Sequence, residues 1–179
     1  MYESFRPFMP SGYQVKFVTE PWEQRGAAAL RRDVFCREQG IFEADDRDAI
    51  DETAIPIVAV SLLGVAAGEV AGTVRIHQAS PGIWWGSRLA VATPYRRAGA
   101  LGASLIRLAV SSAHARGAAE FYAHVQARNV PLFERLHWHK MEDVTLHGHP
   151  HGLMRADLAA YPPIMEAETG FMALARNAA

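Results

Sequence analysis

A stretch of small residues between two arginines and an apolar helix is the part of the chain best suited to chemistry. Residues 96–103 read Arg-Arg-Ala-Gly-Ala-Leu-Gly-Ala and follow the apolar run at 88–91. A strand that passes through such a turn into a helix points unpaired backbone N–H groups and the positive end of the helix dipole at one spot. With two guanidinium groups beside it, the turn predicts a phosphate-binding site.

The turn lacks the lysine and hydroxyl of a nucleotide-triphosphate loop, and it lacks the three-glycine spacing of a dinucleotide fingerprint. We therefore predict a pyrophosphate cradle in mid-chain, which suits coenzyme A. The residues expected to contact this group are Arg96, Arg97, Ala98, Gly99, Ala100, Gly102 and Ala103.

Residues 91–105 resemble the acyl-CoA signature of the GNAT N-acetyltransferases, V-x-P-x-x-R-G-x-G-x-G/A followed by a helix. The signature arginine could align with Arg96 or with Arg97. We prefer Arg97, because Leu105 then falls on a helix position that usually packs inward. Ala100 then stands where the family has its first glycine, and a small residue still lets a phosphate approach the backbone.

Three further motifs follow the order of this family. Residues 129–138 resemble N-x-x-x-x-Y-x-x-x-G-F, and residues 148–154 match a late P-H-x-x-M element. Residues 30–48 resemble an early block, L-R-x-x-V-F-x-x-E-Q and then D-x-x-D, of one bacterial branch. Together the motifs resemble most the small GNAT proteins associated with bacterial nitrilase gene clusters.

The resemblance implies a single-domain α+β fold, with a mixed, mostly antiparallel sheet of about six to seven strands flanked by helices. It also implies an N-acetyltransferase that moves the acetyl group of acetyl-CoA to a primary amine of a small molecule by direct attack. A backbone N–H would stabilise the oxyanion, an effect worth about 3 kcal/mol. The strand at 121–126 must splay away from residues 89–91 to admit the cofactor. The implied contacts away from the turn are Leu89, Ala90, Val91, Asn129 and Phe133.

The candidates for the general base are Glu38, Asp46, Asp48 and His151, which all fall on family motifs. Glu38 could instead pair with Arg37 or Arg31. Asp46 and Asp48 belong to an acidic cluster at 43–52 that could line an entrance for a cationic amine, or could form a solvated charged loop.

Two residues depart from the family pattern. Phe133 stands where a tyrosine often serves as general acid, and a phenyl ring cannot donate a proton. His137 stands where a glycine ends the helix, so it either adopts a left-handed conformation at a cost on the order of 1 kcal/mol or the helix ends differently. The alternation of His147, His149 and His151 fits a metal site on a strand, but the intervening glycine and proline favour a turn.

Length and composition bound the class of protein. A chain of 179 residues with 50% apolar content supports one core. A net charge of −1 indicates no nucleic-acid partner. The longest apolar run, 54–67, is interrupted and falls short of the roughly 20 residues of a membrane span. The single cysteine, Cys36, excludes an internal disulfide and fits a cytoplasmic protein.

Hydrophobic periodicity predicts an N-terminal tail at 1–12, a domain at 13–158 and a loosely attached tail at 159–179, of which 164–176 could be helical. One of the adjacent Trp84 and Trp85 should face outward, at a pocket or at the subunit contact of a homodimer. The expected helices are 20–40, 101–116 and 131–136. The expected strands are 14–19, 57–63, 69–78, 83–91, 121–125, 140–147 and 152–158.

Three other functions stay open. An acyl-homoserine-lactone synthase has the same fold, but it normally takes its acyl chain from a carrier protein and should lack so well-formed a phosphate cradle. A non-catalytic CoA-binding protein would explain Phe133. A metal-dependent hydrolase built on the late histidines is the most distant alternative.

Overall fold

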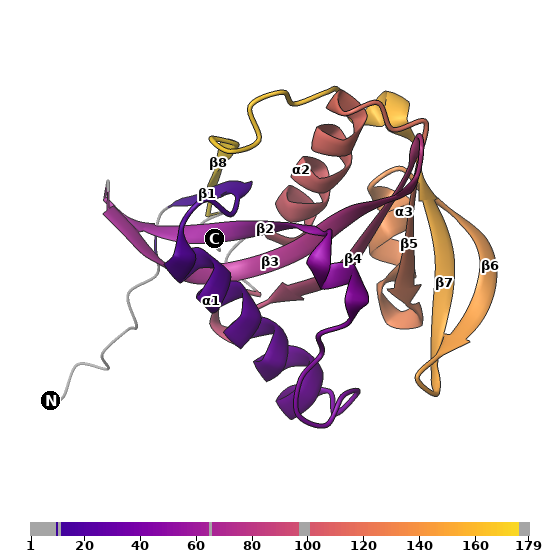
Figure 1. Cartoon of the computed structure of the whole chain (residues 1–179), viewed down its shortest axis with the longest axis horizontal. Helices are drawn as coiled ribbons and strands as arrows, with labels where there is room; N and C mark the ends of the chain where they lie inside the picture. Colours follow the sequence, from indigo (N-terminus) through magenta and orange to yellow (C-terminus); the bar gives the residue numbers. More distant parts are fainter. Residues whose placement is uncertain (1–9, 11, 65, 97–100, 176–179) are drawn as a thin grey trace, which may run out of the picture.

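One eight-stranded sheet forms the centre of the molecule in the computed structural model, which describes residues 10, 12–64, 66–96 and 101–175 (Figure 1). Its strand order is β6-β7-β5-β4-β3-β2-β1-β8, and β4 and β5 are its one parallel pair within the described residues. The expected α+β fold with a mostly antiparallel sheet is confirmed. The strands are β1 (Gly12–Phe17), β2 (Ile55–Leu63), β3 (Ala66–Ser80), β4 (Ile83–Val91), β5 (Glu120–Gln126), β6 (Trp138–Leu146), β7 (His149–Ala156) and β8 (Phe171–Leu174).

The α-helices of the described residues, α1 (Pro21–Arg31), α2 (Leu101–Ala115) and α3 (Val130–Arg135), flank the sheet. The alternation of side chains along β2 shows that α1 and α2 cover opposite faces. Ile57 and Ala59 belong to the core that contains α2, whereas Val58 and Val60 pack with Ala27 of α1. Figure 1 shows the two helices on either side of the strands. In the described part of the chain, no helix is both long and apolar enough to cross a bilayer.

The first helix ends in a π-helical turn that shapes the later site. Glu20 is the N-cap of α1, Pro21 lies in its first turn, and Glu23 completes a capping box. Beyond Arg31 the segment Arg32–Glu38 forms a π-helix (η1), and Gly40 follows with a φ of 62°. Short π-helical segments are often found at functional sites. Here the segment carries Phe35 to the wall of a cavity between the strands.

The C-terminal segment differs from the expected loose or helical tail. Residues 171–174 form β8, which pairs antiparallel with β1 and gives the sheet one more strand than expected. Tyr161 and Ala167 are buried in the main core. The backbone N–H of Phe17 donates to the carbonyl of Ala167 at 2.8 Å, and the N–H of Ile164 donates to that of Ser111 at 3.1 Å. The segment is therefore an integral part of the core.

Gly170 lies where this segment meets β1. It has a φ of 63°, and a Cβ atom there would lie 1.8 Å from the carbonyl oxygen of Val15. Gly170→Ala is therefore expected to lower the free energy of unfolding by about 3 kcal/mol, because both the backbone conformation and the contact oppose a side chain. Urea denaturation measures this loss.

Gly148→Ala is the matched control for that variant. Gly148 also has a positive φ, 75°, but nothing lies within 4 Å of its Cβ position. This substitution should cost only about 1 kcal/mol, the strain of the left-handed backbone itself. Equal losses for the two variants would show that the contact with Val15 contributes nothing.

Candidate active site

The two parallel strands diverge at the centre of the sheet. Ile83–Gly86 of β4 pairs with Glu120–Ala123 of β5. Beyond Gly86, β4 continues beside β3, while the end of β5 continues beside β7. The expectation that this strand splays away from residues 89–91 is confirmed, and Figure 1 shows the two arrows separating.

A β-bulge marks the side of β4 that faces the opening. Thr73 of β3 pairs with Ala90, but Arg75 pairs with Ser87, so that Arg88 and Leu89 together stand opposite one residue of β3. Arg88 has a φ of 56°, a left-handed conformation that is rare for a residue with a side chain. A bulge leaves backbone groups outside the strand ladder. Leu89 lines the cavity at this point.

Buried ion pairs hold Arg88 in this conformation. Its Nε donates to Oδ2 of Asp46 at 3.0 Å and to the carbonyl of Asp46 at 3.2 Å. Asp46 is 1% exposed and also accepts from Nε of Arg31 at 2.7 Å. Both Nη atoms of Arg75 donate to the carboxylate of Asp48, at 2.7 and 2.9 Å. The charged network consists of Arg31, Arg75, Arg88, Asp46, Asp48 and Asp51.

This network distinguishes Asp46 and Asp48 from the exposed acidic residues Glu43, Asp45 and Glu52 of the same cluster. Hydrogen bonds from Arg75 hold the pKa of Asp48 below its ordinary value, although partial burial opposes them. Burial also opposes ionisation of Asp51, but hydrogen bonds from Arg31 and Arg75 keep its pKa far below the ordinary value. Asp46 does not line the cavity, and Asp48 lines it with both carboxylate oxygens already bonded. Neither residue is free to attract a cationic amine.

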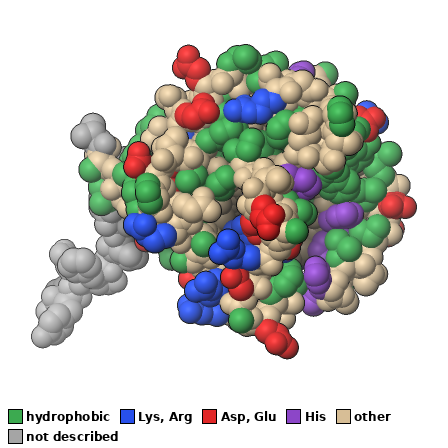
Figure 2. Space-filling view, in the orientation of Figure 1, with side chains coloured by type: hydrophobic (Ala, Val, Ile, Leu, Met, Phe, Trp, Pro, Cys, Tyr) green, Lys and Arg blue, Asp and Glu red, His purple; other side chains and the backbone are tan. Residues whose placement is uncertain are grey.

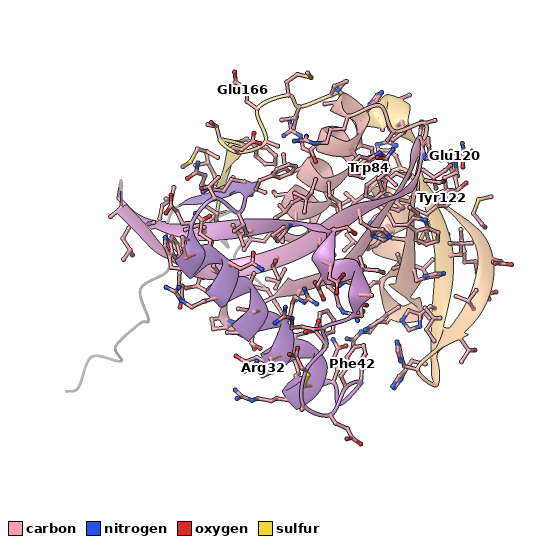
Figure 3. The ribbon with its side chains drawn as sticks, in the orientation of Figure 1. Arg32, Phe42, Trp84, Glu120, Tyr122 and Glu166 are labelled. Atoms are coloured by element: carbon pink, nitrogen blue, oxygen red, sulfur yellow. The ribbon has the colours of Figure 1, made fainter. Side chains whose placement is uncertain are left out.

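A cavity of about 490 Å³ lies at the opening between β4 and β5, within the range of small-molecule sites. Trp85 contributes to its wall, with its ring 5.3 Å from that of Tyr122 and 5.0 Å from that of His124. Phe42 contributes from the segment after η1, with its ring 4.9 Å from that of His147. Figure 3 labels Phe42 on this segment and Tyr122 on β5. Trp85 is thus the outward member of the tryptophan pair, and it faces a pocket.

Four histidines from separate elements line this cavity: His77, His124, His147 and His151. Figure 2 shows histidine side chains grouped on this face of the molecule. His124 is exposed on β5, and partial desolvation of its ring together with the nearby charge of His151 lowers its pKa. Burial and the charge of Arg75 lower the pKa of His77. Imidazoles with lowered pKa values are neutral near pH 7 and can accept a proton.

His124 was absent from the candidates that the sequence provided. The signal was its alternation with buried residues on β5, since Phe121, Ala123 and Val125 face the core. His124 therefore faces the opposite side, with His151 on the neighbouring β7.

The late histidines do not share one strand face. His147 and Gly148, with φ values of 50° and 75°, are the central residues of the turn between β6 and β7. This is the turn that the glycine and proline favoured, in the form typical of two-residue hairpins. Within the described residues, no group of three potential ligands could hold a metal ion.

His137 has a φ of 66°, so this residue, just beyond α3, adopts the left-handed conformation, which is the first of the two alternatives considered for His137.

Glu38 has a partner that the sequence did not indicate. Its carboxylate accepts from Nη1 and Nη2 of Arg96 at 2.6 and 2.8 Å, and Nε of Arg96 donates to the carbonyl of Val91 at 2.9 Å. These bonds from Arg96 hold the pKa of Glu38 below its ordinary value. Glu38 does not line the cavity between β4 and β5 but a smaller hollow beside it. A carboxylate engaged in this way is a poor general base.

The structure describes only some of the residues that are expected to hold the cofactor. Arg97, Ala98, Gly99 and Ala100 lie outside the described residues. Gly102 and Ala103 lie in the first turn of α2, and none of the described residues has an atom within 4 Å of the Cβ position of Gly102. Space over this turn is what a phosphate would need to approach the backbone.

The remaining cofactor candidates lie around the opening. Asn129 is exposed at the start of α3, makes no side-chain cap bond and lines the cavity. Phe133 also lines the cavity, buried against Trp138 at 5.1 Å between ring centres. Ala90 is buried in a core cluster, so only its backbone could serve a ligand.

Solved structures share this fold at low sequence identity. A protein assigned as an N-acetyltransferase from Lactobacillus plantarum has a TM-score of 0.71 and 22% identity, covering 82% of this chain and 98% of that chain. An acyl-CoA N-acyltransferase from Pseudomonas aeruginosa has a TM-score of 0.64 and 20% identity, covering 81% and 99%. A CoA-dependent acyl-homoserine lactone synthase, BjaI, has a TM-score of 0.66 and 17% identity, covering 82% and 83%.

No match was found among curated proteins. The sequence profile of the acetyltransferase (GNAT) family, in contrast, matches residues 1–138, well over half of the chain. The diverging strands, the bulge on β4 and the helix that follows it agree with this match. The chain therefore belongs to the acetyltransferase (GNAT) family.

Proposed function

We propose that the protein transfers the acetyl group of acetyl-CoA to the primary amine of a small molecule in the cytoplasm. The observation that carries the proposal is the opening between β4 and β5, which leads into a cavity that His124 lines together with three further histidines. The motifs shared with GNAT proteins of nitrilase gene clusters support a bacterial enzyme of that branch.

Residues on both sides of the opening would hold the cofactor, which supplies the acetyl group as an activated thioester. The backbone at Leu89–Val91 would contact its pantetheine arm from β4, and Asn129 would contact it from α3. The first turn of α2, where no described residue comes within 4 Å of the Cβ position of Gly102, would receive the pyrophosphate. Arg96 stands at this end of the opening, bonded to Glu38.

His124 would act as the general base in place of Glu38. As the amine nitrogen forms its bond to the acetyl carbon, Nε2 or Nδ1 of His124 takes the proton that the nitrogen loses. The carbon–sulfur bond breaks, and its electron pair leaves with the sulfur as the thiolate of coenzyme A. Phe133 cannot protonate that thiolate, so water supplies the proton. The backbone N–H of Leu89 at the bulge would stabilise the oxyanion that develops on the acetyl oxygen.

Arg97→Glu tests whether the turn at 97–100 binds the pyrophosphate. This substitution replaces a charge-assisted contact by repulsion and should weaken CoA binding by roughly 2–3 kcal/mol. Calorimetric titration of the wild type and the variant with CoA measures the difference. Unchanged affinity would overturn the alignment that places Arg97 at the phosphate.

A second candidate is an acyl-homoserine-lactone-synthase-like acyltransferase. The shared fold with BjaI favours it, as does the early arginine and aspartate block. Because that protein is described as CoA-dependent, the phosphate-binding turn does not separate the two functions as we expected. Release of free thiol from acetyl-CoA does separate them, when small amines are compared with S-adenosylmethionine as acceptor. A non-catalytic CoA-binding protein would release thiol with neither.

A further inference from the structure

The wall of the cavity is rich in aromatic and apolar side chains. Trp85 is half-buried, and its ring is tilted by 33° to Tyr122 and by 37° to His124. Phe42 is half-buried on another part of the wall, where the Arg88 guanidinium carbon lies 4.6 Å from its ring centre. The apolar side chains that complete the wall include Phe35, Ile41, Ile50 and Leu146. Such a wall favours a ligand with a planar apolar body.

The charge on the wall is as informative as its shape. Among the described residues that line the cavity, Asp48 is the sole carboxylate, and Arg75 and Arg88 already bind it. Lysine is absent from this set, so the fixed charges are two guanidinium groups and one carboxylate. A ligand with a second ammonium group would lose its hydration and find no free anion. It would also approach two arginines.

The amine of the acceptor must reach the opening between β4 and β5. This requirement determines which side of the cavity the rest of the acceptor contacts. Trp85 is the residue before Gly86, where the last pairing between β4 and β5 occurs. His124 follows Ala123, the partner of Gly86 on β5. An amine beside His124 therefore places the body of the molecule next to Trp85.

We propose that the acceptor is an aromatic monoamine, with one primary amine on a short chain attached to a planar ring and no second positive charge. This inference rests on the proposed acetyl transfer and narrows its substrate class. The ring packs on Trp85, and the amine lies at His124. The arginine and aspartate network, which is neutral as a whole, shapes the site and attracts no cation.

Competing acceptors test the proposal in the wild-type protein. Phenethylamine and its saturated counterpart cyclohexylethylamine differ in the aromaticity of the ring, and the diamine putrescine has a second ammonium group and no ring. Thiol release from acetyl-CoA should give phenethylamine a kcat/KM about five- to ten-fold above cyclohexylethylamine, as ring packing predicts, and further above putrescine. A preference for putrescine, or equal values for the two ring compounds, would overturn the proposal.

Binding measurements distinguish a failure of the aromatic-monoamine proposal from a failure of the proposed acetyl transfer. Titration of the protein with acetyl-CoA alone reports on the proposed function, and absence of binding there would contradict acetyl transfer itself. Titration of the CoA-loaded protein with each amine reports on the acceptor. Heat with phenethylamine and none with putrescine supports the aromatic monoamine, whereas the reverse, or heat with neither, rejects it.

A pair of tryptophan variants tests whether Trp85 causes the preference for an aromatic ring. Trp85→Leu should remove the preference for the aromatic ring over the saturated one. Trp22→Leu is the matched control, because Trp22 of α1 is also half-buried but packs toward Val58 and Val60 of β2 and does not line the cavity. The preference should survive in this control. A preference unchanged in Trp85→Leu would show that the ring binds elsewhere.

Discussion

His124→Gln should reduce kcat by about 10²-fold or more, the usual contribution of a general base, while the affinity for CoA stays unchanged. The glutamine keeps a polar side chain of similar reach on β5 but cannot take a proton from the amine. Steady-state thiol release at saturating amine measures kcat, and calorimetry measures CoA binding. His139→Gln is the control, because His139 on β6 is exposed, as His124 is, but lines neither hollow. Equal activity in the two variants would remove His124 from the chemistry.

The pH dependence of kcat/KM provides a second readout for His124. Activity should rise with pH as His124 loses its proton, and partial desolvation together with the charge of His151 places this pKa below the ordinary 6.5. His151→Gln removes the like charge, so the pKa of His124 rises and the acid limb moves to higher pH. Glu142 acts in the opposite direction, so Glu142→Gln should move the limb to lower pH. An acid limb that neither substitution moves would exclude His124 as the titrating group.

Asp46→Ala should lower the free energy of unfolding by about 3–5 kcal/mol, the usual cost of removing one partner of a buried ion pair. The variant leaves Arg31 and Arg88 buried without the carboxylate that both contact. It should also lower kcat, because Arg88 no longer has the partner that holds the bulge on β4. Urea denaturation followed by kinetics at a temperature where the variant is folded measures both effects.

Asp33→Ala is the matched control for this loss of charge. Asp33 also pairs with an arginine, Arg37, at 2.6 Å, but both side chains are more than half exposed, at 56% and 73%. Exposed pairs contribute about 0–1 kcal/mol. Similar losses for Asp46→Ala and Asp33→Ala would show that the buried network adds nothing to stability. If Asp46→Ala fails to fold, Asp46→Asn, which keeps a hydrogen-bond acceptor, replaces it.

The sequence predicted most of the sheet because its strands carry local patterns, but it could not predict β8. The segment Phe171–Leu174 contains alanine, leucine and methionine, which favour helices locally. Its strand conformation comes from pairing with β1, more than 150 residues earlier in the chain. Pairing at that separation leaves no periodic signal within the segment, so the local preference was misleading.

The same limit applies to the charges of the candidate site. The acidic run at 43–52 has the composition of a solvated loop, yet Asp46 is buried because Arg88, 42 residues later, contacts it. Glu38 pairs with Arg96, 58 residues later. The opening between β4 and β5 was predictable because a family motif marks it. The partners of individual carboxylates depend on tertiary contacts that no spacing along the chain encodes.

Because β4 and β5 pair only over Ile83–Gly86 and diverge beyond it, the sheet has two parts that are joined by this short parallel pairing. A ligand in the opening contacts both parts of the sheet, so it binds the native state and not the unfolded chain. Ligand binding there raises the stability of the native state, by about 2.7 kcal/mol when the ligand is present at 100 times its Kd. Substrate bound between β4 and β5 should therefore stabilise the whole native protein. Local separation of these two strands should be the first motion that a bound ligand suppresses.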